Sequence, residues 1–102
     1  MSRLQKLTRL LEADPNDPFV LYGIAQEHAA GGDHAQAIAF YDRCLAADPS
    51  YCYAYFHKAR SQQALGDDAA AAETARAGIK AAQAAGDAQA LGELSGLLDE
   101  LT

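Results

Sequence analysis

The sequence is poor in several residue types that mark particular classes of protein. It has two cysteines, three prolines and one methionine, and it has no tryptophan. Two cysteines do not make a disulfide framework, so we expect a reducing compartment, the cytoplasm. No run of 18 apolar residues occurs, which predicts no membrane-spanning helix. Residues 1–11 lack the apolar stretch of a secretory signal and are interpreted as a surface helix.

Positive charge is also scarce. Eight lysines and arginines stand against fourteen aspartates and glutamates, which gives a net charge of −6. Binding to nucleic acid requires a clustered cationic surface, and an anionic membrane surface attracts basic segments. We therefore expect neither nucleic acid nor a membrane as a partner.

Motifs for catalysis and for metal binding are missing as well. No Gly-x-Gly-x-x-Gly, phosphate loop or Gly-x-Ser-x-Gly occurs. Glu27-His28 and Asp33-His34 lack the His-Glu-x-x-His spacing of a zinc site. Cys44 and Cys52 are interpreted as ordinary thiols, although a helix dipole could lower the pKa of Cys52 at the start of its helix. The sequence predicts no enzyme, no metal and no cofactor.

What the sequence does contain is regular helix punctuation. Ser2 and Gln5 fit a capping box, and Asp17 before Pro18 fits a helix start. Gly32-Asp33, Gly66-Asp67 and Gly86-Asp87 repeat one turn, a glycine that ends a helix and an aspartate that starts the next. These signals predict six helices and no strand. Leucines at helical spacing predict a buried stripe in the first helix: Leu4, Leu7, Leu10 and Leu11.

The spacing of these signals is the strongest feature of the sequence. Asp14-Pro15 and Asp48-Pro49 are 34 residues apart, as are Gly32-Asp33 and Gly66-Asp67. A 34-residue helix–turn–helix period is typical of the tetratricopeptide repeat, a family that this sequence resembles over nearly its whole length. The resemblance implies an all-α fold, a right-handed α-solenoid of antiparallel helix pairs with about six helices. It also implies one domain, with a truncated repeat at 1–15, repeats at 18–51 and 52–87, and a capping helix at 88–102.

The last helix is expected to bury the same repeat positions as the full repeats, namely Leu91, Leu94, Ser95 and Leu98. The resemblance further implies that the first helix of each repeat lines a concave groove. The residues at those positions are Phe19, Tyr22, Gln26, Tyr53, Phe56, Arg60 and Gln63. Aromatic residues and arginine are the residues that binding hot spots use. The alternative is that flanking helices partly cover these rings.

These residues predict the chemistry of a partner. The family's clamp for C-terminal carboxylates needs lysine and asparagine, and neither occurs at the predicted groove positions. Apolar anchors and a carboxylate for Arg60 would suit the groove. In the last helix, Gly92 and Gly96 would leave one wall without side chains, so that a bound backbone could come close.

The predicted function is therefore a protein–protein interaction module that binds a peptide or partner protein in the groove. The alternative is self-assembly into a weak homo-oligomer. Residues 1–11 carry Arg3, Lys6 and Arg9 without an acid, and the segment from Asp87 onward carries four acids without a base. Two ends of opposite charge would favour head-to-tail contact between copies of the chain at low salt. The mass of the chain in solution distinguishes the two functions.

Overall fold

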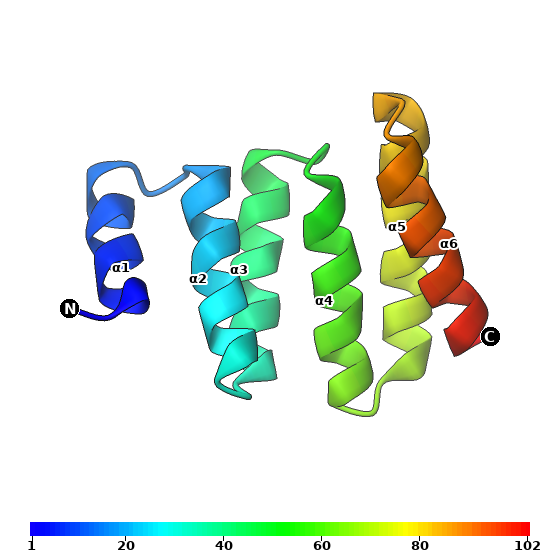
Figure 1. Ribbon diagram of the computed structural model, residues 1–102, viewed down its shortest axis with the longest axis horizontal. Helices are drawn as coiled ribbons and strands as arrows, with labels where there is room; N and C mark the ends of the chain where they lie inside the picture. Colours follow the sequence, from blue (N-terminus) through cyan, green and yellow to red (C-terminus); the bar gives the residue numbers. More distant parts are fainter.

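The computed structural model describes residues 1–102, and all of its regular structure is α-helical. The helices are α1 (Arg3–Ala13), α2 (Pro18–Ala30), α3 (His34–Ala47), α4 (Cys52–Ala64), α5 (Asp68–Ala85) and α6 (Ala88–Leu101). They run up and down in sequence order, with the two termini at opposite ends of the molecule (Figure 1). The predicted solenoid of antiparallel helices is confirmed. None of the helices is both long enough and apolar enough to cross a bilayer.

Helix ends fall where the sequence predicts them. Ser2 and Gln5 form a complete capping box, and the Asp17 side chain accepts hydrogen bonds from the first backbone N–H groups of α2. Asp33, Asp67 and Asp87 cap α3, α5 and α6 in the same way. The glycine before each of these three aspartates has a positive φ, between 70° and 83°, a backbone conformation that residues other than glycine rarely adopt.

The helices form two layers of unequal spacing. Helix α4 contacts both α2 and α6, whereas α3 and α5, which lie on the other side, do not contact each other. The α2–α4–α6 layer is therefore the more closely spaced one. A stack bends toward its closely spaced layer, so the concave surface lies on the side of α2, α4 and α6. Helix α6 crosses in front of α5 in Figure 1 and closes one end of the stack.

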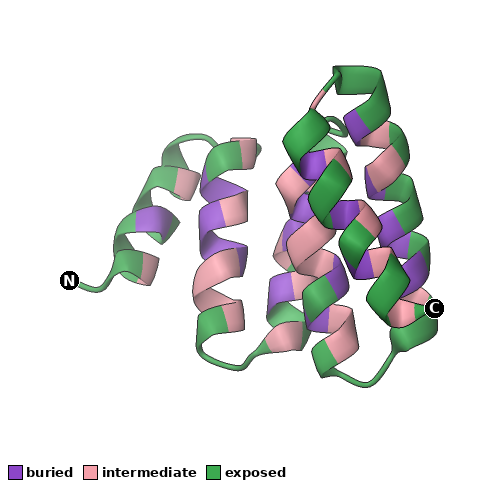
Figure 2. Cartoon of the chain, turned by 45° about the vertical axis from the view of Figure 1, so that its right-hand side comes forward, coloured by how far each residue is buried: buried purple, intermediate pink, exposed green.

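The core lies between the two layers, where buried residues face one another (Figure 2). Its largest fully buried side chain is Tyr41 of α3. Around Tyr41 pack the fully buried Leu21, Ala25, Ala37, Cys44 and Ala54. The small residues in this cluster let the helix backbones approach, and the ring of Tyr41 fills the space that remains between them.

The stripe predicted for α1 is only partly buried. Leu7 is buried and packs with Val20 and Ile24, and Leu4 and Leu11 pack against the same cluster. Leu10, however, is 57% exposed, so its predicted burial is wrong. The reason is that α1 contacts α2 alone, and no helix covers the side of α1 that carries Leu10.

The buried face of α6 also differs from the prediction. Leu94 is buried as expected, but its buried companions are Ala90 and Leu97. Leu91, Ser95 and Leu98 are only half-buried. Helix α6 packs on α5 and α4, so the face that turns inward is the one toward those two helices.

Candidate functional site

A hollow of about 460 Å³ opens on the concave side between α4 and α6. We call it the α4–α6 groove. Four lining residues come from α4 and four from α6: Tyr53, Phe56, His57, Arg60, Glu93, Gly96, Leu97 and Glu100. Spacings of three and four residues place each set on one face of its helix. The two facing sets therefore form two walls of one groove.

The α4 wall is aromatic. Phe56 meets the His57 ring edge to face, with 5.2 Å between the ring centroids. Tyr53 lies one turn earlier, and the buried Leu97 lines the groove from α6. Gly96 contributes no side chain, and a Cβ built there would meet no heavy atom within 4 Å. The groove thus offers apolar surface with open space beside the backbone of α6.

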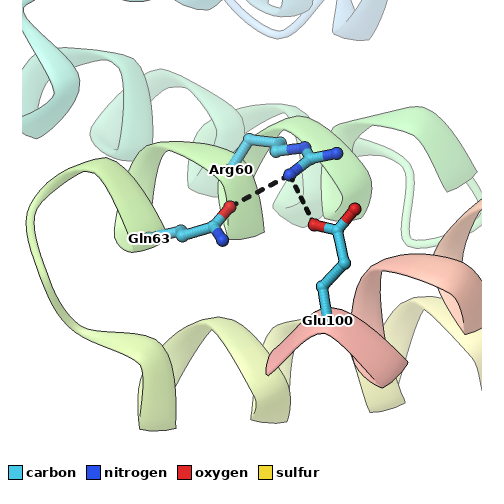
Figure 3. A network of polar contacts seen from close by, with 3 residues as sticks. All are labelled: Arg60, Gln63 and Glu100. Atoms are coloured by element: carbon cyan, nitrogen blue, oxygen red, sulfur yellow. Dashed lines mark hydrogen bonds and ion pairs between the residues drawn. The ribbon is translucent and has the colours of Figure 1, made fainter. Parts of the chain in front are cut away.

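Arg60 is held by a carboxylate of the chain itself. Its Nη1 donates to Glu100 Oε2 at 3.0 Å and to Gln63 Oε1 at 3.1 Å (Figure 3). Its guanidinium carbon also lies 5.4 Å from the centroid of the Phe56 ring. The two side chains of the ion pair are 44% and 55% exposed, so water screens the pair and it contributes little stability. A carboxylate from a ligand would have to share Arg60 with Glu100.

Glu93 has no such partner. The ion pairs in the structure are Lys58–Asp42 and Arg60–Glu100, and Glu93 belongs to neither. Partial desolvation raises the pKa of the Tyr53 hydroxyl, and so do the hydrogen bond that this hydroxyl donates to the Glu93 carboxylate and the repulsion by its negative charge. A negative charge thus lies beside an aromatic side chain with no cation to neutralise it.

His57 lies between the groove and the core. Its ring is 5.9 Å from that of Tyr22 and 6.4 Å from that of Tyr41. Burial lowers the pKa of His57; the charge of Glu93 opposes this shift and that of Arg60 adds to it. The neutral imidazole is therefore the form that the folded chain favours.

This shift predicts a pH dependence of stability. The folded pKa of His57 lies below the ordinary value of 6.5. The unfolded chain therefore binds a proton at His57 at a higher pH than the folded chain does, so the free energy of unfolding is unaffected by His57 above pH 6.5 and decreases as the pH falls toward the folded pKa. We expect the free energy of unfolding, measured with urea, to decrease below pH 6.5. In His57→Gln this part of the decrease should disappear. An equally steep decrease in the variant would assign it to other groups.

The other predicted site residues lie apart from the groove or at its margin. Phe19 is 67% exposed in the first turn of α2. Tyr22 is half-buried against Tyr51, with ring centroids 4.9 Å apart, and Gln26 accepts a hydrogen bond from the Tyr41 hydroxyl. Gln63 touches the groove only through Arg60. The structure thus brings Tyr53, Phe56 and Arg60 together and leaves the α2 residues outside that hollow.

The acidic wall of the groove was not predicted from the sequence. Glu93 and Glu100 are seven residues apart, two helical turns, with Gly96 between them on the same face of α6. That spacing was a usable signal. His57, four residues after Tyr53, was another. Of the two glycines predicted to line this wall, Gly96 lines the groove, whereas Gly92 is not among its lining residues.

Both cysteines are buried free thiols. Burial raises the pKa of Cys44 to about 11. Burial also raises the pKa of Cys52, whose thiol donates to the Ser50 carbonyl oxygen. For Cys52 desolvation outweighs the backbone hydrogen bond that lowers the pKa, so the net shift is upward, opposite to the lowering considered from the sequence. No group of three or more histidines, cysteines and acids lies close enough together to hold a metal ion.

Comparisons with known proteins agree with the fold. A family model described as tetratricopeptide repeat matches residues 20–51, and no curated protein matches the sequence. A tetratricopeptide repeat domain protein from Salinibacter ruber, solved in solution, is 31% identical with a TM-score of 0.80; the match covers 86% of this chain and 89% of that one.

Two further solved structures share the fold. A Bordetella parapertussis protein is 25% identical with a TM-score of 0.86, over 99% of this chain and 88% of that one. The TPR2B domain of yeast Sti1 is 23% identical with a TM-score of 0.90, over 96% of this chain and 78% of that one. With the 34-residue period, the helix pairs and the Salinibacter relative in agreement, the chain belongs to the tetratricopeptide repeat family.

Proposed function

We propose that the chain is a protein-interaction module that holds a peptide segment of a partner protein in the α4–α6 groove. The observation that carries the proposal is the hollow of about 460 Å³ whose α4 wall is formed by Tyr53, Phe56 and His57. Aromatic side chains in a concave site supply apolar contact area at low entropic cost. The yeast Sti1 domain, which shares the fold, was solved as a complex with pHsp70, which supports binding as the use of this architecture.

The remaining predicted residues lie outside this hollow. We assign residues 18–51 and 52–87 to two repeats, with 1–15 and 88–102 as flanking helices. Phe19, Tyr22 and Gln26 then belong to the first repeat and would extend the surface beyond the hollow, toward a longer peptide. Because the hollow is small, we expect micromolar rather than nanomolar affinity.

Removing the aromatic wall should abolish binding. In the double variant Tyr53→Ala plus Phe56→Ala we expect capture of partner proteins from a lysate of the source organism to decrease by about 30-fold or more, since a hot-spot aromatic contributes about 2 kcal/mol. The measurement is quantitative mass spectrometry of the proteins retained on the immobilised chain.

The control is Leu65→Ala, which removes an exposed apolar side chain that does not line the hollow and should retain capture. Helicity measured by circular dichroism shows whether each variant folds, because Tyr53 and Phe56 also pack beside a buried cluster. A folded double variant that captures the same proteins as the unaltered chain would place binding on another surface.

Self-assembly is a second candidate, favoured by two uncovered sides of α1. Leu10 is exposed on one side, and on another a hollow of about 430 Å³ is lined by Met1, Leu4, Gln5, Thr8, Arg9 and Glu12. Sedimentation at several protein and salt concentrations separates the two functions. A salt-independent monomer supports the groove, and a mass that rises with concentration at low salt supports assembly.

A further inference from the structure

The charges in the α4–α6 groove indicate which peptides it accepts. We infer that the groove selects a peptide carrying a lysine or arginine whose charge meets Glu93. This inference rests on the proposed function, since it specifies the ligand of the same groove. It replaces the carboxylate that the sequence predicts as the partner of Arg60.

The charge balance of the groove is negative. Glu93 and Glu100 bring two carboxylates, and Arg60 brings one guanidinium. Arg60 and Glu100 neutralise each other at 3.0 Å, which leaves the charge of Glu93. His57 adds no competing cation near pH 7, because its pKa is lowered. The net charge of −6 on the chain attracts a cationic peptide from further away.

An acidic ligand meets the opposite situation. Arg60 already donates to Glu100 and Gln63. A carboxylate that approached Arg60 would lie close to Glu100 and would also enter the field of Glu93. Like charges at such short range repel each other. The one cation of the groove is thus no free anchor for an acidic side chain.

The surroundings of Glu93 suit the shape of a basic side chain. Lysine and arginine carry an apolar stem behind a charged end. The stem can lie along the Tyr53 ring, and the charge can reach both the carboxylate of Glu93 and the face of the ring. Beside them Gly96 leaves space open between the helices, which lets the side chain enter from the concave side. The Tyr53 ring therefore suits the apolar stem of a basic side chain, and the Glu93 carboxylate suits its charged end.

The test is a selection from a library of random dodecapeptides displayed on phage, followed by affinity measurement with the enriched peptide. We expect the enriched sequences to share a lysine or arginine at a fixed spacing from an apolar residue. With that peptide labelled by fluorescein, polarisation should show about five-fold weaker binding to Glu93→Gln, the effect of losing a pair of about 1 kcal/mol. Replacing the peptide's basic residue by methionine should weaken binding to the unaltered chain by a similar factor and have little effect on the variant.

The matched control is Glu73→Gln, which removes the same charge from an exposed position on α5, outside the groove, and should change affinity less than two-fold. Enrichment of acidic or uncharged peptides, or basic peptides that bind Glu93→Gln undiminished, would overturn the inference. If those peptides still need Tyr53 and Phe56, the proposed function survives. If no peptide is enriched over the Tyr53→Ala plus Phe56→Ala variant, both fail.

Discussion

Replacing Tyr41 by alanine is expected to lower the free energy of unfolding by about 3–5 kcal/mol, the cost of deleting a buried aromatic ring. Tyr41 is fully buried and is the largest such side chain in the chain. Its ring fills the space among small residues, with Ala25, Ala37 and Ala54 in the same cluster. None of these can extend into the cavity, so the cavity stays open. For a domain whose total stability is about 5–15 kcal/mol, the loss is a large share.

Urea denaturation followed by circular dichroism measures this change, and Tyr41→Phe is its control. The phenylalanine keeps the ring and loses only the hydroxyl, which donates to Gln26. Because Gln26 is half-buried and water can replace the hydroxyl, we expect a loss of about 1 kcal/mol. If the two variants lost equal stability, the hydrogen bond rather than the ring would be the main contribution, contrary to the packing described above.

The helices and their order were predictable because their signals are local. Gly66 and Asp67 end one helix and start the next through their own backbone and side chain, whatever packs around them. The 34-residue period adds the register, which places Cys44 and Ala37 in the core, and both are fully buried. Helix ends can thus be predicted from a few neighbouring residues, and the register can be predicted by comparing one repeat with the next.

The inward faces of the outer helices were not predictable in the same way. A repeat register assumes a neighbour on each side, and Leu10 lacks one. The groove has the same difficulty, because Arg60 and Glu100 are 40 residues apart and meet only through the packing of α6 against α4. The repeat positions of Tyr53, Phe56 and Arg60 place these residues on one face of α4 from the sequence alone. No local pattern indicates that a carboxylate from α6 already binds the arginine.

Gly78→Ala is expected to destabilise the chain by about 1–3 kcal/mol, although alanine is the better helix former by about 1 kcal/mol. Gly78 lies in α5 where that helix meets both α4 and α6. A Cβ at this position would lie 2.6 Å from the Cβ of Tyr55 and 2.9 Å from a methyl carbon of Leu94. The Tyr55 atom is next to the backbone and cannot rotate away, so the helices themselves must move apart.

Gly92→Ala makes the same substitution in α6, where a Cβ would meet nothing within 4 Å. There the helix propensity acts alone, and we expect a gain of about 0.5–1 kcal/mol. In thermal and urea denaturation, the midpoint of Gly78→Ala should therefore decrease and that of Gly92→Ala should increase. Equal gains would show that α5 does not approach α4 and α6 as closely as described. A loss confined to Gly78→Ala would show that α5 approaches α4 and α6 so closely that no Cβ fits at the point where the three helices meet.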